Sequence, residues 1–261
     1  SFFKLKKTGG IKNPKPPRFK HSNFNIRYSP NIFRISNSTI RLTVSKQQKE
    51  YLKQKYNLDV KYLYIQIPDR YKNLAGKVKV IEIIPISGSN RYKVNIIIDL
   101  PAVERKEDNG IYMSIDLGIN NFMTCYVSTG KSMIISGRQL LSINRYFDKE
   151  ISYYQSIAFA QQSASGLKHY KNTKRIQQLY AKHRKQINHL LHTATKKVID
   201  FADQEGVSMI IIGDLSHIRD DKNIGHVNNQ KLHKFPFKKI EQLLAYKAED
   251  KGISIDKQEE S

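Results

Sequence analysis

Two apolar runs in this sequence end in an aspartate. At the end of a strand, such a residue would present a carboxylate for metal chemistry. Asp116 lies in "YMSIDLGINN", just before a glycine and an Asn-Asn turn. Asp214 lies in "IIIGDLSHIR", where the apolar run stops. Hard divalent cations such as Mg²⁺ prefer carboxylate oxygens that are gathered from separate elements of a fold. Both residues are therefore candidate metal ligands.

Each aspartate also has a purely structural interpretation. Asp116 can cap the turn that follows it through Asn120 and Asn121, and Asp214 can bond to the local backbone of a strand-ending turn. The residues alone leave both alternatives open.

The order of elements in the second half of the chain predicts how these residues are positioned. Three consecutive strands, "IYMSIDLG", "FMTCYVST" and "SMIISG", are joined by turns at Asn120-Asn121 and Gly130-Lys131. Helical patterns follow at 138–163 and 169–204, then a buried strand at 207–214. A polar loop is expected over 219–235, a helix that Gly252 ends, and a last strand, "ISID". This order predicts an RNase H-like α/β layer with a helical insertion at about 138–204.

The first half of the chain has a different pattern. Its first 25 residues form a basic, proline-spaced segment that is expected to be extended and that carries Lys15, Arg18 and Lys20. Short alternating runs between residues 32 and 100, with a short helix at "KQQKEYLKQKY", predict a small antiparallel barrel or sandwich. The polar stretch "ERKEDNG" at 104–110 predicts a boundary between domains 1–110 and 111–261.

Composition favours a polyanionic partner. The 261 residues include 45 Lys and Arg against 23 Asp and Glu, a formal net charge of +22, which points to nucleic acid. No apolar run reaches about 18 residues and no signal peptide is evident, so we expect a cytoplasmic protein without a membrane partner. Cys125 is the only cysteine, so zinc is not expected, and a buried position on a strand is favoured.

The helical insertion combines an apolar side with a strongly basic one. We expect phosphate contacts from Arg175, Lys182, Arg184 and Lys185, because few acidic residues balance them. The alternative is a solvated charged helix. Three histidines, at 183, 189 and 192, lack Cys or carboxylate neighbours at ligand spacing and are expected at packing or surface positions.

Several motifs in order resemble one known family. "IKNPKPPRFK", "SIDLGINNFMTCYVSTGK", "IIIGDLSHIR" and "LAYKAEDKGISI" are similar to TnpB, the OrfB-type transposon-encoded proteins related to type V CRISPR effectors and Fanzor proteins. The resemblance implies a wedge-type antiparallel β-barrel in 1–110 that grips a guide RNA. It also implies a RuvC nuclease domain in 111–261 that cuts target DNA with Mg²⁺ or Mn²⁺.

The resemblance assigns Asp116 the first of three acidic metal ligands, and the chain departs from the family at the second. Gly213 stands where the family usually has a glutamate. Some lineages use a glutamate about 45 positions later instead, and Glu259 and Glu260 lie 46 and 47 positions after Gly213. Glu260 is the better match, although an exposed chain end explains the same residues without the family. Asp214 stays a further candidate.

The resemblance also implies that the chain begins inside the wedge region and stops before the family's final aspartate, so we expect an internal fragment with impaired cleavage. Three functions remain open: a transposon-associated, RNA-guided DNA endonuclease of the kind often called a transposase; an inactive remnant that binds RNA or DNA; and a guide-free structure-specific nuclease. The basic, proline-spaced N-terminal segment and the expected barrel argue against the guide-free nuclease.

Overall fold

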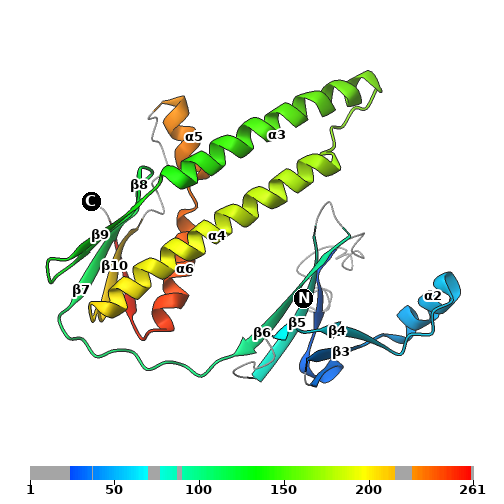
Figure 1. Ribbon diagram of the computed structural model, residues 1–261, viewed down its shortest axis with the longest axis horizontal. Coiled ribbons are helices and arrows are strands. Elements are labelled where there is room, and N and C mark those ends of the chain that lie inside the picture. The colour runs from blue at the N-terminus through cyan, green and yellow to red at the C-terminus, as the bar shows by residue number, and fades with distance from the viewer. Residues whose placement is uncertain (1–23, 37, 70–76, 87–89, 215–224, 260–261) are drawn as a thin grey trace, which may run out of the picture. The chain divides into compact units, whose positions relative to one another are not determined.

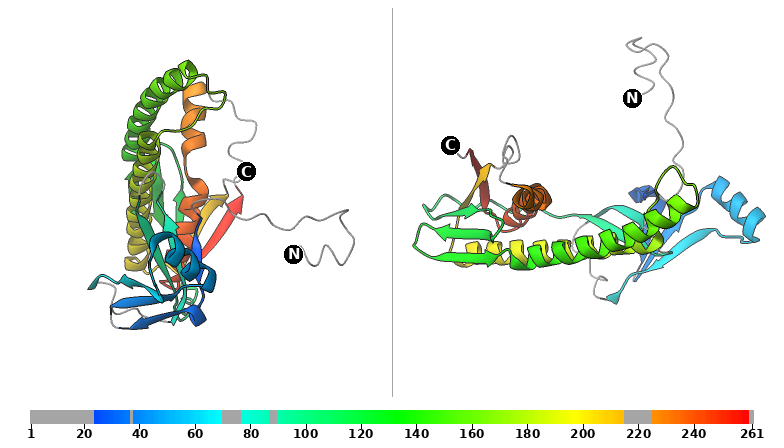
Figure 2. Two further views of the ribbon diagram at one scale, coloured as in Figure 1. Left: turned by 90° about the vertical axis from the view of Figure 1, so that its right-hand side faces the viewer. Right: turned by 90° about the horizontal axis from the view of Figure 1, so that it is seen from above.

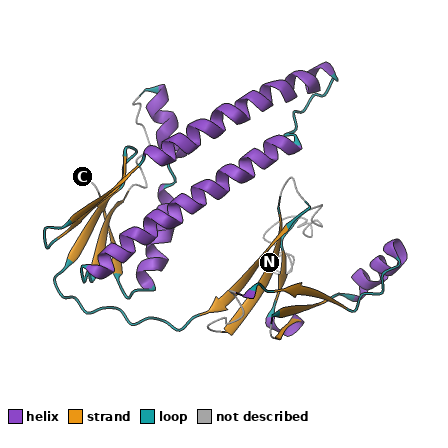
Figure 3. Cartoon of the chain, in the orientation of Figure 1, coloured by secondary structure: helices purple, strands orange, loops and turns teal. Residues whose placement is uncertain are grey.

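The chain divides into two compact units, Ser1–Pro101 and Ala102–Ser261. The computed structural model describes residues 24–36, 38–69, 77–86, 90–214 and 225–259. Figures 1 and 3 show that the first unit is built mainly of strands, whereas long helices accompany the strands of the second. Within the described ranges, no helix is both long enough and apolar enough to span a membrane.

The first unit contains two three-stranded antiparallel sheets that share one core. One sheet has the order β1-β5-β6 and the other β2-β3-β4. Their strands are β1 (Ile26–Tyr28), β5 (Lys77–Pro85), β6 (Tyr92–Asp99), β2 (Phe33–Ser36), β3 (Thr39–Thr43) and β4 (Tyr62–Gln66), with the short helix η1 (Pro30–Ile32) between β1 and β2. Tyr28 and Ile81 from the first sheet meet Ile40 and Leu42 from the second in one buried cluster. The alternating runs in the sequence therefore supply the facing apolar sides of two packed sheets.

The expectation of a closed barrel is wrong for the described residues, which form two open sheets. A barrel needs a continuous ladder of hydrogen bonds around its circumference, with staggered strands of sufficient length. Here β1 has three residues and β2 has four, and no described pairing joins the two sheets. The first unit is therefore built from two packed, open sheets.

The short helix α2 (Lys46–Tyr56) confirms the helix expected from the sequence. Ser45 and Gln48 form a capping box at its start: the Gln48 N–H donates to Ser45 Oγ at 3.2 Å, and the Ser45 N–H donates to Gln48 Oε1 at 3.1 Å. The helix ends where Asn57 adopts a left-handed conformation with φ of 52°.

A five-stranded mixed sheet forms the framework of the second unit, in the order β11-β10-β7-β8-β9. Three antiparallel strands, β7 (Tyr112–Asp116), β8 (Asn121–Val127) and β9 (Ser132–Ser136), follow one another along the chain as predicted. Strand β10 (Met209–Asp214) lies between β7 and β11 (Ser254–Glu259) and is parallel to both. The sheet therefore brings the ends of β7 and β10 to the same edge.

Helices cover one face of this sheet. The two long helices α3 (Arg138–Ala164) and α4 (Lys174–Gln204) confirm the predicted helical insertion, and they lie side by side in Figures 1 and 2. Residues of α4 and of α6 (Phe237–Glu249) join the buried side of the strands in one large core. A second buried cluster lies between α3 and α4: Phe147, Ile151, Ala158, Ile176 and Leu179.

The polar stretch 219–235 was expected to be a loop, and this is wrong for its described part, which contains helix α5 (His226–Lys234). Leu232 and Phe235 are buried in the main core of the unit, at 7% and 2% exposure. Two apolar anchors three residues apart are too few to give a periodic signal, but their burial stabilises the helix in the folded unit.

The segment 104–110, expected as a domain boundary, is bonded to the second unit. The Lys106 N–H donates to the Gly252 carbonyl at 2.8 Å, and Lys106 Nζ pairs with Asp203 Oδ1 at 2.9 Å. Lys251 pairs with the other Asp203 oxygen at 2.8 Å. Hydrogen bonds from Lys251 and then Lys106 hold the pKa of the Asp203 carboxyl below its usual value.

A first prediction concerns Gly137, which joins β9 to α3. A Cβ at this position would lie 2.1 Å from the Ile119 carbonyl oxygen, although the φ of −79° suits any residue. We expect Gly137→Ala to lower the free energy of unfolding by about 1–3 kcal/mol through this overlap. Chemical denaturation checks it, with Ser132→Ala, at an exposed position of β9, as a control that changes little. Equal stability of both variants would contradict the expected overlap.

Candidate functional site

Asp116 lies at the end of β7 on the side of the sheet away from the main core. Met113, Ile115 and Leu117 are buried, whereas Ser114 and Asp116 between them are exposed. Among the described residues, no hydrogen bond or ion pair engages the Asp116 carboxylate. The strand alternation therefore presents this carboxylate to solvent, free to accept a ligand.

Backbone groups close the turn that follows Asp116. The Gly118 N–H donates to the Asn121 carbonyl at 3.1 Å, and the Gly137 N–H donates to the Asn120 carbonyl at 2.7 Å. In the described part of the chain, these bonds hold the turn without the Asp116 side chain. The structure thus gives no support to the capping role that the sequence left open.

The free energy of unfolding tests whether Asp116 caps the turn that follows it. Because Asp116 caps nothing in the described residues, Asp116→Ala should change the free energy of unfolding by no more than about 0.5 kcal/mol. Thr173→Ala is the matched control in the same unit, since Thr173 Oγ1 accepts a hydrogen bond from the Ile176 N–H at the start of α4. Loss of that cap should cost about 1 kcal/mol. A comparable loss in Asp116→Ala would restore the capping role.

The register of β7 and β10 identifies the neighbours of Asp116. Ile115 pairs with Ile212, so the next position along β10, Gly213, is level with Asp116 on the same face. Gly213 in turn pairs with Gln258 of β11. The row across the three strands therefore contains one carboxylate, one glycine and one amide.

The other candidate carboxylates have different positions. Asp214 follows Gly213 along β10 and pairs with Glu259 of β11. Because successive positions of a strand alternate between the two faces of a sheet, the positions of Asp214 and Glu259 belong to the face opposite Asp116. The register does not favour Asp214 or Glu259 as a partner of Asp116, and both stay predictions. Glu260 lies outside the described residues and also stays a prediction.

The face around Asp116 exposes large side chains. Thr124 of β8 pairs with both Asp116 and Ile134, which places the three residues in one row. Ile134 is 61% exposed, and Tyr126, two residues from Thr124 on the same face, is 53% exposed. No described helix covers these side chains, so a large ligand can reach this face.

The described residues supply only part of a divalent-metal site. In those ranges, no group of three or more His, Cys, Asp or Glu side chains is close enough to hold a metal ion. Asp116 has the oxygen chemistry that Mg²⁺ prefers, but one carboxylate does not complete a coordination shell. The residues fit a single ligand position and no more.

One side of α4 carries a basic stripe, defined here as Arg175, Lys182 and Lys185. They lie seven and then three positions apart in the sequence, a spacing that places side chains on the same side of a helix. All three are exposed, and the described residues contain no carboxylate that pairs with them. Arg184 is also exposed but points to a different side of α4. The stripe is suited to contact with phosphates. The predicted contacts Lys15, Arg18 and Lys20 lie outside the described residues.

His183 and Cys125 have packing positions. His183 stacks near Phe147, with ring centroids 5.0 Å apart, and a ring nitrogen lies 2.8 Å from Asn144 Oδ1. Burial lowers the pKa of His183, which favours the neutral ring. The expected burial of Cys125 is confirmed, and burial raises the pKa of its thiol to about 12.

The comparisons with known proteins agree with the family resemblance. The OrfB_IS605 family, described as a probable transposase, matches residues 90–219. A TnpB-like protein, ORF457 of Acidianus two-tailed virus, is 27% identical over 143 residues, which are 54% of this chain and 30% of that protein. The CRISPR-associated endodeoxyribonuclease Cas12f1 of Sulfoacidibacillus thermotolerans is 26% identical over 193 residues, which are 73% of this chain and 44% of the relative.

A solved structure, of a Cas12f1-sgRNA-target DNA complex, has a similar fold, with a TM-score of 0.63 at 17% identity over 98% of this chain and 58% of that one. The fold is thus a mixed α/β fold that resembles Cas12f. Residues 90–219 match the OrfB_IS605 family, and the chain is TnpB-like and distantly related to Cas12f. It spans less than half the length of the two curated relatives.

Proposed function

We propose that this chain is part of a TnpB-type, RNA-guided DNA endonuclease. Its second unit acts as the RuvC, RNase H-like nuclease layer, and its first unit acts as the wedge-type domain. The observation that carries the proposal is the free Asp116 carboxylate at the end of β7, beside the parallel strand β10. Catalytic groups of α/β sheets commonly lie at such strand ends.

Asp116 would hold Mg²⁺ or Mn²⁺ through its carboxylate oxygens. A bound metal of this kind activates water and stabilises charge on the phosphate. Gly213 has no side chain to contribute at the level of Asp116. The register position of Glu259 belongs to the face of the sheet opposite Asp116. We therefore keep Glu260 as the candidate second carboxylate.

Guide RNA and target DNA are the proposed partners. The net charge of +22 and the basic stripe on α4 provide attraction for phosphates, independent of base sequence. The relative with a similar fold was solved with sgRNA and target DNA, which supports this assignment.

The proposal is tested by the nucleic acid that the protein retains. We expect the purified chain to carry RNA, which resists DNase, is removed by RNase and is enriched in discrete sequences on sequencing. The matched control is the variant with Glu at all three stripe positions, purified in parallel, which should retain less RNA. Retention of no nucleic acid at low salt would contradict the proposal.

Cleavage assays separate the alternatives. Slow Mg²⁺-dependent cutting that requires the guide and is lost in Asp116→Ala supports the endonuclease. Binding with identical background cleavage in the parent and in Asp116→Ala supports the inactive remnant. Cutting of branched DNA without RNA supports the guide-free nuclease.

A further inference from the structure

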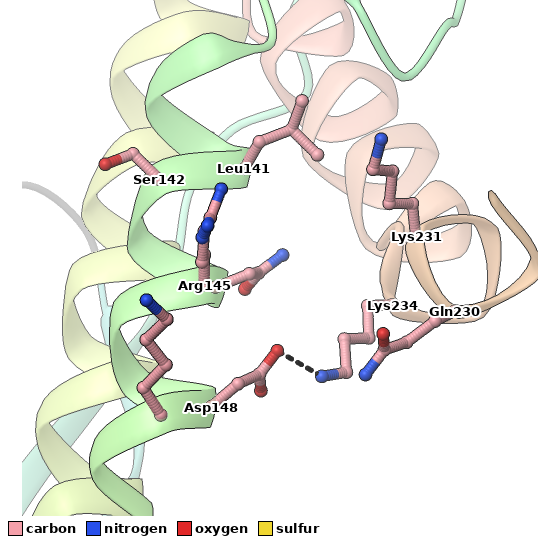
Figure 4. Close-up of a pocket in the computed structure, with 9 residues that line it drawn as sticks. Leu141, Ser142, Arg145, Asp148, Gln230, Lys231 and Lys234 are labelled. Carbon is pink, nitrogen blue, oxygen red and sulfur yellow. Dashed lines mark hydrogen bonds and ion pairs between the residues drawn. The ribbon is translucent and has the colours of Figure 1, made fainter. Parts of the chain in front are cut away.

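A cavity of about 760 Å³ lies between the first turns of α3 and helix α5, on the second unit (Figure 4). Arg145 and Asp148 on α3 and Lys231 and Lys234 on α5 line the opening, and Asp148 and Lys234 reach toward each other across it. Asn144, Lys149 and Gln230 also contribute to its lining. Helix α5 forms one whole wall, so the cavity depends on the helix that the sequence pattern did not predict.

The charge of this cavity is uneven. Four cationic side chains line it against the single carboxylate of Asp148. Lys234 Nζ binds Asp148 Oδ2 at 2.5 Å, so that carboxylate is engaged. In the described part of the chain, Arg145, Lys149 and Lys231 have no carboxylate partner. Cations gathered around one opening repel each other until an anion neutralises them.

A neutral hydrogen-bond donor is fixed at the same place. An amide oxygen only accepts hydrogen bonds, so the His183 ring nitrogen 2.8 Å from Asn144 Oδ1 donates to it. The Asn144 amide is then oriented by α4. Within the residues that the structure describes, no hydrogen bond engages its NH₂ group, and Asn144 lies in the lining of the cavity. Fixed amide donors beside Arg and Lys are suited to the oxygens of a phosphate.

The α3 wall of the cavity follows soon after the proposed metal ligand, Asp116, in the sequence. Helix α3 begins directly after Gly137, whose N–H binds the Asn120 carbonyl in the turn that follows Asp116. Arg145 lies eight residues further along, roughly 12 Å at the rise of an α-helix. About two turns of α3 therefore separate Arg145 from the turn that follows Asp116.

We propose that the α3–α5 cavity binds backbone phosphates of a nucleic-acid strand, with Arg145, Lys149 and Lys231 as the contacts and Asn144 as a positioned donor. This site rests on the proposed function, since it places part of the strand that the nuclease layer handles. Asp148 has a structural role: it holds Lys234 and so joins the two walls.

The first test is protection of lysines from acylation, followed by mass spectrometry of the full chain with and without an oligonucleotide. Lys149 and Lys231 are expected to lose reactivity at least about threefold when a single-stranded 20-mer is bound. Lys238, exposed on α6 and outside the cavity, is the internal control. Separate RNA and DNA arms identify which strand occupies the cavity. Unchanged reactivity of Lys149 and Lys231 in both arms, under saturating binding, would overturn the proposal.

The second test uses the double variant Arg145→Gln/Lys231→Gln, which leaves the Asp148–Lys234 pair intact. Loss of two phosphate contacts should reduce the slope of log affinity against log salt by about 2, and weaken binding roughly 10- to 30-fold near physiological salt. Lys238→Gln/Lys239→Gln removes the same charge from α6 and should weaken binding less than about threefold. Thermal unfolding of each variant verifies that both fold.

The outcomes separate the cavity from the wider function. Equal weakening by the two double variants refutes the cavity and leaves the proposed function in place, because the chain still binds nucleic acid through distributed charge. Absence of any binding by the parent chain at low salt refutes the proposed function itself, and with it the site.

Discussion

Affinity of the chain for nucleic acid is expected to fall by roughly 10³- to 10⁵-fold as salt rises from about 50 to 200 mM, if six to ten phosphates are contacted. Each phosphate that a Lys or Arg neutralises releases condensed counterions, and added salt opposes that release. The excess of 45 basic over 23 acidic residues makes this the dominant contribution to binding. Fluorescence anisotropy of a labelled oligonucleotide over a salt series measures the slope.

The basic stripe on α4 should carry part of this slope. Reversing all three charges, with Glu at Arg175, Lys182 and Lys185, should weaken binding to unrelated sequences alike and reduce the slope by about 3. The matched pair is Lys185→Glu against Arg184→Glu, which are adjacent exposed residues on different sides of the helix. We expect Lys185→Glu to have the larger effect.

Two results would contradict this account of binding. Affinity that stays constant across the salt series would exclude phosphate contacts as its main source. Equal effects of the Lys185 and Arg184 variants would show that net charge, and not the stripe, determines affinity.

The second large effect is expected at Gly213. This residue is level with Asp116 on the adjacent parallel strand and the same face of the sheet. In Gly213→Glu, two carboxylates from neighbouring strands can share one divalent ion, and a gain of about 1.4 kcal/mol already makes binding tenfold tighter. We expect Mn²⁺ to bind at least roughly 10-fold more tightly, measured by electron paramagnetic resonance of the free ion.

Gly213→Gln is the control for this substitution, since it adds the same bulk without a charge. It should leave Mn²⁺ affinity unchanged, and Asp116→Asn combined with Gly213→Glu should lose most of the gain. A gain that survives Asp116→Asn would show that the new carboxylate binds metal elsewhere and would refute the shared site.

The rate of DNA cleavage should also depend on how many carboxylates hold the metal. Loss of one preorganised electrostatic contact costs roughly 10² to 10³ in rate, so the parent chain is expected to cut target DNA poorly with guide RNA and Mg²⁺. Glu260→Gln and Asp214→Asn show which residue supplies any remaining activity, and we expect the Glu260 variant to be the more impaired. Efficient cutting by the parent that survives Glu260→Gln would contradict a site in which Asp116 depends on that residue.

Local sequence determined most of the secondary structure. Apolar alternation predicted β7, β8 and β9, and helical periodicity predicted α3 and α4, because those patterns reflect one buried face for each element. Ser45 and Gln48 specify the start of α2 through bonds that involve only neighbouring residues. The apolar strand around Cys125 was enough to predict its burial.

The tertiary structure decided which of these elements meet. Whether the two sheets of the first unit close depends on strand pairing across the unit, which alternation does not specify. Helix α5 forms because Leu232 and Phe235 are buried by distant elements. The pairing of β7 with β10 joins segments 97 residues apart, as in the bond from Ser208 Oγ to the Ile111 carbonyl. A shift of one residue there would exchange Gly213 for a carboxylate beside Asp116. Burial of Met113 and Ile115 of β7, and of Ile210 and Ile212 of β10, against the helices excludes that shift. Register follows from this long-range burial and not from the composition of either strand.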